Sequence, residues 1–104
     1  MPIPDHENEE AVVSESKEKL QKPPLYRVLI HNDDFTTMEF VVFVLTNVFR
    51  KAESDAFRVM LQVHVEGVGV AGVFTYEIAQ MKAEKATNLA RANEFPLLFT
   101  VEEE

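Results

Sequence analysis

The most informative part of the sequence for the fold is Leu25-Tyr26-Arg27-Val28-Leu29-Ile30 (residues 25–30), with the polar residues after it. It is rich in β-branched and aromatic residues, which favour a strand, and the turn formers Asn32-Asp33-Asp34 end it. Thr36-Thr37-Met38-Glu39 then has the form of a capping box, with Thr36 as the cap and Glu39 three residues later. The helix that follows carries a core-facing stripe of apolar residues at i, i+3, i+4 and i+7, namely Val41, Val44, Leu45 and Val48.

The middle of the chain predicts a second helix and a second strand. Ser54 is a good cap, and Gly67 is a typical residue to end a helix. The same helical spacing recurs between them at Phe57, Met60, Leu61 and His64. Residues 68–74 are β-branched but interrupted by Gly69 and Gly72, which indicates a strand with a bulge or a close contact.

Thr75 is placed to cap a third helix that runs to about Asn93, and Pro96 ends that region. Residues 97–101 make the last strand. The order is therefore β-α-α-β-α-β. It predicts an α+β fold, a two-layer α/β sandwich in which three helices cover one face of a three-stranded antiparallel sheet.

Composition limits the classes of function. The chain has 104 residues, room for one domain. Its 10 basic and 18 acidic residues give a net charge of −8, which disfavours nucleic acid and suits cationic partners. There is no cysteine, no apolar run long enough to span a membrane and no secretion signal, so we expect a cytoplasmic protein. We also expect a monomer.

The first residues differ from the rest. Residues 1–22 carry six acids, three lysines and no aromatic residue, and Pro23-Pro24 closes the segment. Such a composition predicts a disordered acidic tail, either a solubilising terminus or an arm delivered to a partner. Residues 23–104 form the predicted folded domain.

Two groups of polar residues are candidates for function. Asn32-Asp33-Asp34 suits ordinary turn chemistry, a metal site or the recognition of an ammonium group, whose three donors need acceptors. A lone histidine such as His64 is more often packed or on the surface, but it follows Met60 by four residues. A neutral imidazole there could accept a hydrogen bond at the mouth of an apolar pocket.

Catalysis has little support. The chain has no serine–histidine pattern with a supporting acid and no phosphate-binding glycine loop. His31 with Asp33 or Asp34 is the only cluster of metal-ligand type, and it leaves a small metal-dependent enzyme as a hypothesis. Otherwise we expect no catalytic residue, metal or cofactor.

The motifs resemble those of the ClpS family. Asn-Asp-Asp-Phe-Thr-Thr-Met-Glu-Phe-Val (32–41) is similar to that family's Asn-Asp-Asp-Tyr-Thr-Pro-Met-Glu-Phe-Val, and Met-Leu-Gln-Val-His (60–64) resembles its second motif. Residues 72–77 with Lys82, and then Pro-Leu-Leu (96–98), match in the same order. The resemblance covers about residues 23–103.

The resemblance implies an adaptor of the bacterial N-end rule pathway. Such adaptors bind proteins that begin with Leu, Phe, Tyr or Trp and deliver them to the AAA+ unfoldase ClpA for degradation by ClpP. By position, Asn32 and His64 would bind the substrate's α-amino group directly, and Asp33 and Asp34 would supply negative charge. The pocket for the first side chain would be lined by Ile30, Thr36, Met38, Val41, Met60, Val63 and Leu97.

The resemblance also assigns further roles. Met38 stands where the family has a gatekeeper against β-branched first residues, and Glu77 and Lys82 fall where the family docks on the amino-terminal domain of ClpA. Thr37 replaces the usual proline and Phe35 the commoner tyrosine, which raises the hypothesis of a divergent second copy with narrower preference. The alternative is a ClpA-docking regulatory module that binds no amino termini.

Overall fold

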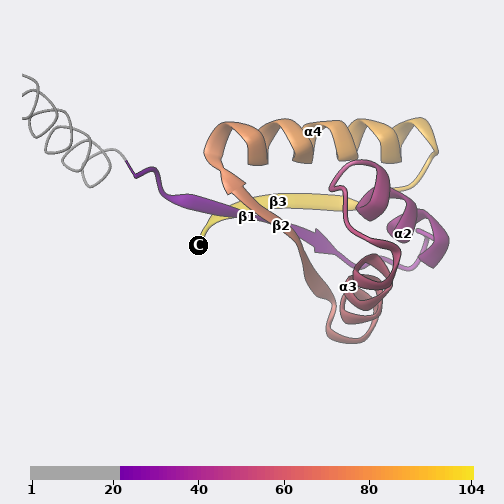
Figure 1. Ribbon diagram of the computed structural model, residues 1–104. Coiled ribbons are helices and arrows are strands. Elements are labelled where there is room, and N and C mark those ends of the chain that lie inside the picture. The colour runs from indigo at the N-terminus through magenta and orange to yellow at the C-terminus, as the bar shows by residue number, and fades with distance from the viewer. Residues whose placement is uncertain (1–21) are drawn as a thin grey trace, which may run out of the picture.

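The computed structural model describes residues 22–104. The tail predicted over residues 1–22 therefore lies outside the described residues, apart from Lys22. Strands and helices follow one another in the predicted order, as β1 (Leu25–His31), α2 (Met38–Asn47), α3 (Glu53–Glu66), β2 (Val68–Thr75), α4 (Tyr76–Ala92) and β3 (Leu98–Glu103). Helix α4 lies along the sheet, and α2 and α3 gather at the end where β1 finishes (Figure 1).

The three strands form one antiparallel sheet in the order β2-β1-β3, so β1 is its centre. Val28 pairs with Gly72 and Leu29 with Val70, which leaves Ala71 as the extra residue of a β-bulge. A Cβ on Gly72 would lie 2.5 Å from the ring of Phe74. The prediction of a bulge or close contact at the glycines of this strand is confirmed.

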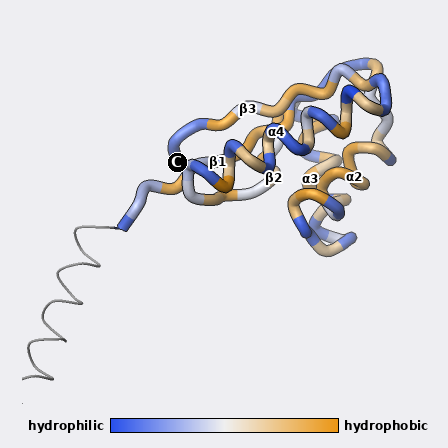
Figure 2. The backbone as a smooth tube through the Cα atoms, turned by 90° about the horizontal axis from the view of Figure 1, so that it is seen from above, coloured by the Kyte–Doolittle hydropathy of each residue, from blue (hydrophilic) through white to orange (hydrophobic). Residues whose placement is uncertain are grey.

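A single core joins one face of the sheet to all three helices. On β1 the alternate residues Val28 and Ile30 are fully buried. The predicted stripe of α2 is buried as well. Helix α4 turns a row of small residues toward the sheet, namely Ala79, Ala83, Ala86 and Ala90. Hydrophobic and hydrophilic residues accordingly alternate around the turns of this helix (Figure 2). The predicted two-layer fold is confirmed.

Two of the predicted helix caps are wrong. The cap of α2 is Thr37, not Thr36: its hydroxyl accepts from the backbone N–H of Phe40 at 3.1 Å. Thr36 is unavailable because its own hydroxyl donates to Asp33. Helix α3 begins one residue before Ser54, after Ala52, which forms no side-chain cap.

The inward face of α3 also differs from the prediction. Its buried residues are Ala56, Met60 and Val63, whereas Phe57 and Leu61 are exposed. The helix ends as expected at Gly67, which has a left-handed backbone (φ +88°). Among residues 22–104, no helix combines the length and the apolar character needed to cross a membrane.

Candidate binding site for an amino terminus

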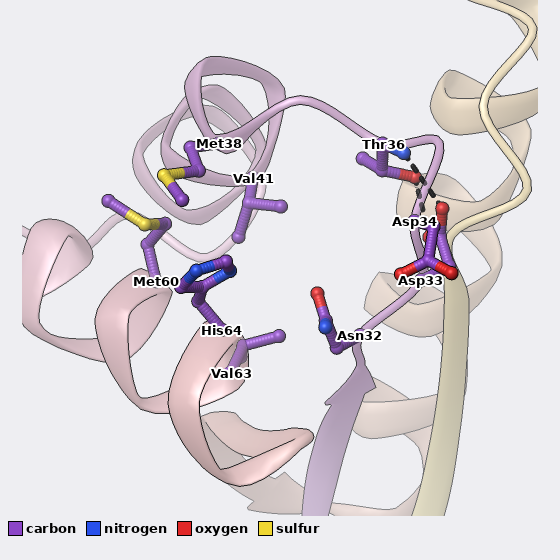
Figure 3. A pocket seen from close by; sticks show the side chains of 9 residues that line it. All are labelled: Asn32, Asp33, Asp34, Thr36, Met38, Val41, Met60, Val63 and His64. Carbon is purple, nitrogen blue, oxygen red and sulfur yellow. Dashed lines mark hydrogen bonds between the residues drawn. The ribbon is translucent and has the colours of Figure 1, made fainter.

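A cavity of about 180 Å³ opens between the end of β1, the loop after it, and helices α2 and α3 (Figure 3). One side is polar and the other apolar. Its lining residues are Asn32, Asp33, Asp34, Thr36, Met38, Val41, Met60, Val63 and His64. All nine are residues that the sequence motifs singled out, and they come from two stretches of the chain, 32–41 and 60–64.

Asn32 and His64 reach the cavity from neighbouring element ends. Asn32 directly follows β1, and its backbone N–H donates to the carbonyl oxygen of Gly67 at 2.9 Å. Gly67 is the C-cap of α3, the helix that carries His64 one turn earlier. The amide of Asn32 and the imidazole of His64 therefore face the same space (Figure 3). Both offer acceptor atoms to a ligand with N–H donors.

Asp33 shapes the loop. Its Oδ1 accepts from the backbone N–H groups of Phe35 at 2.8 Å and Thr36 at 2.7 Å, and its Oδ2 accepts from the Thr36 hydroxyl at 2.6 Å. Burial alone would raise the pKa of this carboxyl, but these hydrogen bonds outweigh it and lower the pKa. The charge of Arg91 acts in the same direction. The carboxylate is thus ionised and turned toward its own loop.

Asp34 differs from its neighbour. It is exposed at the cavity, and among residues 22–104 its carboxylate receives no hydrogen bond. The two aspartates therefore have different roles. Asp33 holds the loop in place, and Asp34 presents negative charge to the cavity.

The apolar side of the cavity consists of two methionines and two valines. Val41, Met60 and Val63 are buried, with exposed fractions of 6%, 4% and 2%. Met38, the first residue of α2, is 45% exposed and lies at the rim. Methionine side chains are unbranched and adapt to different shapes. The cavity slightly exceeds the roughly 150 Å³ of an apolar cavity that holds benzene, so a phenyl ring fits its volume.

Two residues expected in the pocket lie elsewhere. Ile30 and Leu97 are 0% and 1% exposed, and neither lines the cavity. Side chains along β1 alternate between the two faces of the sheet, and Ile30 lies on the face that packs into the core. Both residues thus support the site as part of the core. The sequence predicted a helix end at Gly67 and a close contact at Gly69, but not their partners, which are Asn32 and Val63.

The metal hypothesis has no matching geometry in the described part of the chain. No three histidine or acidic side chains within residues 22–104 are placed to hold an ion. His31 forms a hydrogen bond of 2.7 Å between Nε2 and the Thr100 hydroxyl, across β1 and β3.

The two residues expected to dock a partner lie on α4. Glu77 is exposed in the first turn. Lys82 is turned inward: its Nζ donates to the carbonyl of Val48 at 2.8 Å, at the end of α2, and lies 5.5 Å from the centre of the Phe74 ring. Five positions along a helix turn a side chain by about 140°, so the two residues do not share one face.

Comparison with known proteins identifies the family and the fold. The sequence model described as ATP-dependent Clp protease adaptor protein ClpS matches residues 21–100. The ClpS of Myxococcus xanthus is 52% identical over 101 residues, which is 95% of this chain and 94% of the relative. The ClpS of a Caulobacter species is 54% identical over 94 residues, 90% of this chain and 86% of the relative.

A solved structure is also similar. Agrobacterium tumefaciens ClpS2, bound to L-phenylalaninamide, superimposes with a TM-score of 0.76 at 46% identity, covering 79% of this chain and 99% of that one. ClpS proteins are non-catalytic adaptors of the Clp protease. With the family model matching most of its length, this chain belongs to the ClpS family.

Proposed function

We propose that this protein binds the free α-amino group and the bulky apolar first side chain of N-degron proteins, and delivers them to the ClpA unfoldase for degradation by ClpP. One observation carries the binding step. A single cavity has acceptor groups on one side and an adaptable apolar wall on the other. An amino-terminal residue has the matching shape, with an ammonium group and a side chain on one carbon atom.

The polar side accounts for the selection of free amino termini. The amide of Asn32 and the imidazole of His64 accept hydrogen bonds from the ammonium group, and Asp34 contributes its charge. Asp33 acts through the loop. Acetylation removes the charge and two of the three donors, and it leaves acceptors without partners, which costs about 1–3 kcal/mol.

The apolar side accounts for the selection of the first residue. A leucine or phenylalanine side chain gains about 1.5–3 kcal/mol when it is buried. Met38 at the rim limits the width of the entrance. That the ligand in the Agrobacterium relative is an amide of phenylalanine with a free amine supports this arrangement.

Delivery to ClpA involves the surface of α4 around Glu77. Lys82 contributes by fixing the end of α2, because its amine donates a hydrogen bond to the carbonyl oxygen of Val48. A module that docks without binding amino termini would keep this surface and leave the cavity without a ligand.

Titration calorimetry with four short peptides tests the binding step. The peptides are identical except that they begin with Phe, N-acetyl-Phe, Leu or Ser. We expect the free Phe and Leu peptides to bind, and the acetylated and Ser peptides to bind at least about tenfold more weakly, the factor for 1.4 kcal/mol. Undetectable binding of every peptide while ClpA still binds would leave the docking module as the function.

A further inference from the structure

A second hollow lies on the other side of the loop that borders the cavity. It is an open groove of about 560 Å³ lined by Phe35, Arg91, Glu94, Phe95 and Pro96. Phe35 is 77% exposed and stands at its edge. A single exposed apolar side chain is ordinary, but here it borders a groove with two further apolar residues.

The loop 33–36 is a wall common to the groove and the cavity. Thr36 lines the cavity and its neighbour Phe35 lines the groove, and adjacent Cα atoms are only about 3.8 Å apart. The hydrogen bonds to Asp33 fix the backbone of both residues. Arg91 lines the groove together with Phe35, so it borders the same loop.

The groove is preformed. Arg91 Nη1 donates to the carbonyl oxygens of Phe95 at 2.8 Å and Leu97 at 3.2 Å, which fixes the segment between α4 and β3. The ring of Phe95 packs against that of Phe40 with 4.7 Å between centroids. A groove that already has its bound shape loses less conformational entropy when a ligand binds.

The path of a bound peptide indicates what occupies the groove. With the α-amino group and first side chain in the cavity, the rest of the peptide must leave past the rim. Two extended residues span about 7 Å, and the residues that line the cavity and the groove at this loop, Thr36 and Phe35, are adjacent in sequence. Among the described residues, the hydrogen bonds of Arg91 use only Nη1, which leaves further N–H donors that suit peptide carbonyls.

We infer that this groove receives an apolar side chain from the second or third residue of the same bound N-degron. The inference rests on the proposed binding of amino termini and extends it: the adaptor reads more than the first residue. Phe35, Phe95 and Pro96 supply the apolar contact, and Arg91 holds the backbone of the passing peptide.

The test uses the full chain and four ligands: L-phenylalaninamide and the peptides Phe-Gly-Gly-Gly, Phe-Leu-Gly-Gly and Phe-Gly-Leu-Gly. Phenylalaninamide fills only the cavity. One of the leucine peptides should bind about fivefold or more tightly than the all-glycine peptide, from partial burial of the added side chain. Phe35→Ala should abolish this advantage and change phenylalaninamide affinity less than about twofold.

Phe57→Ala is the matched control, because Phe57 is also exposed (54%) but lies on α3, outside the groove. It should leave the leucine advantage intact. Equal affinity of the three peptides, or an advantage that survives Phe35→Ala, overturns the inference while phenylalaninamide binding upholds the proposed function. Loss of ClpA binding alone in Phe35→Ala would assign the groove to the unfoldase and also overturn it. If phenylalaninamide does not bind, both proposals fail.

Discussion

The backbone N–H of Asn32 donates to the carbonyl oxygen of Gly67 at 2.9 Å, and so joins the end of the central strand to the end of α3. The N–H of Gly67 in turn donates to Val63, a residue of the cavity wall, at 2.9 Å. Through this pair the strand end that carries Asn32 is fixed relative to the helix that carries His64. The cavity is thus assembled by backbone contacts between residues 35 positions apart in the sequence.

Gly67→Ala should weaken this junction. A Cβ at position 67 would meet no atom within 4 Å, but φ is +88°. The cost is therefore conformational, about 1–2 kcal/mol of unfolding free energy, measurable by urea denaturation. Gly67→Asn should lose less, because asparagine tolerates the left-handed region better than alanine. An alanine variant as stable as the original protein would contradict this role of Gly67.

Gly69→Ala should alter the cavity itself. The added Cβ would lie 2.6 Å from Cγ2 of Val63, a stiff β-branched wall residue. Either Val63 or α3 must move, which should cost about 1–3 kcal/mol of stability and weaken binding of phenylalaninamide. Chemical denaturation and calorimetry measure the two effects.

Gly72→Ala is the control for that experiment. Its Cβ would meet the ring of Phe74 at 2.5 Å, a similar clash away from the cavity. It should lower stability without changing affinity for the ligand. If both alanine variants bind phenylalaninamide as the original protein does, Gly69 does not position Val63.

Thr37→Ala should destabilise the start of α2 by about 1 kcal/mol, the usual value of a lost N-cap. Ser54→Ala should change stability by less than about 0.5 kcal/mol, because α3 begins before Ser54 without a side-chain cap. Thermal or urea denaturation of the two variants compares them directly. A larger loss in Ser54→Ala than in Thr37→Ala would contradict these caps, because it is the result expected if Thr36 and Ser54 capped the two helices.

Asp33→Asn should change how stability depends on pH. The pKa of this carboxyl is lowered by folding, so its stabilising effect is fully present above its ordinary value of 3.8 and is lost as the pH falls through the lower folded value. The difference between the two proteins should stay constant above about pH 5 and shrink below about pH 4. We expect this difference in unfolding free energy to be less than about 1 kcal/mol, because the Asp33 carboxyl is partly hydrated. A difference independent of pH would contradict this.

The sequence predicted the fold class and all nine residues of the cavity, for different reasons. Helical spacing of apolar residues identifies the inner face of α2 directly, at Val41, Val44, Leu45 and Val48. On α3 the same rule selected Phe57 and Leu61, which are exposed, because apolar residues on this helix occupy more than one face. The cavity residues came from the resemblance, since an asparagine or histidine alone does not indicate its partner.

Other features depend on specific contacts, some near and some distant in sequence. Whether Thr36 or Thr37 caps α2 is settled by Asp33, which takes the hydroxyl of Thr36. Ile30 and Leu97 lie in the core and not on the cavity wall, which depends on the depth at which the helices pack. The inward turn of Lys82 depends on where α2 ends. None of these follows from local propensity.

The most direct measurement is a comparison of free and N-acetylated Phe-Gly-Gly-Gly across Asn32→Ala, His64→Ala and the double variant, with folding checked by circular dichroism. Each single variant should bind the free peptide about tenfold or more weakly, and the double variant should lose most of the preference for the free amine. If the double variant remains folded and still prefers the free peptide as strongly as the original protein does, Asn32 and His64 do not hold the amino terminus.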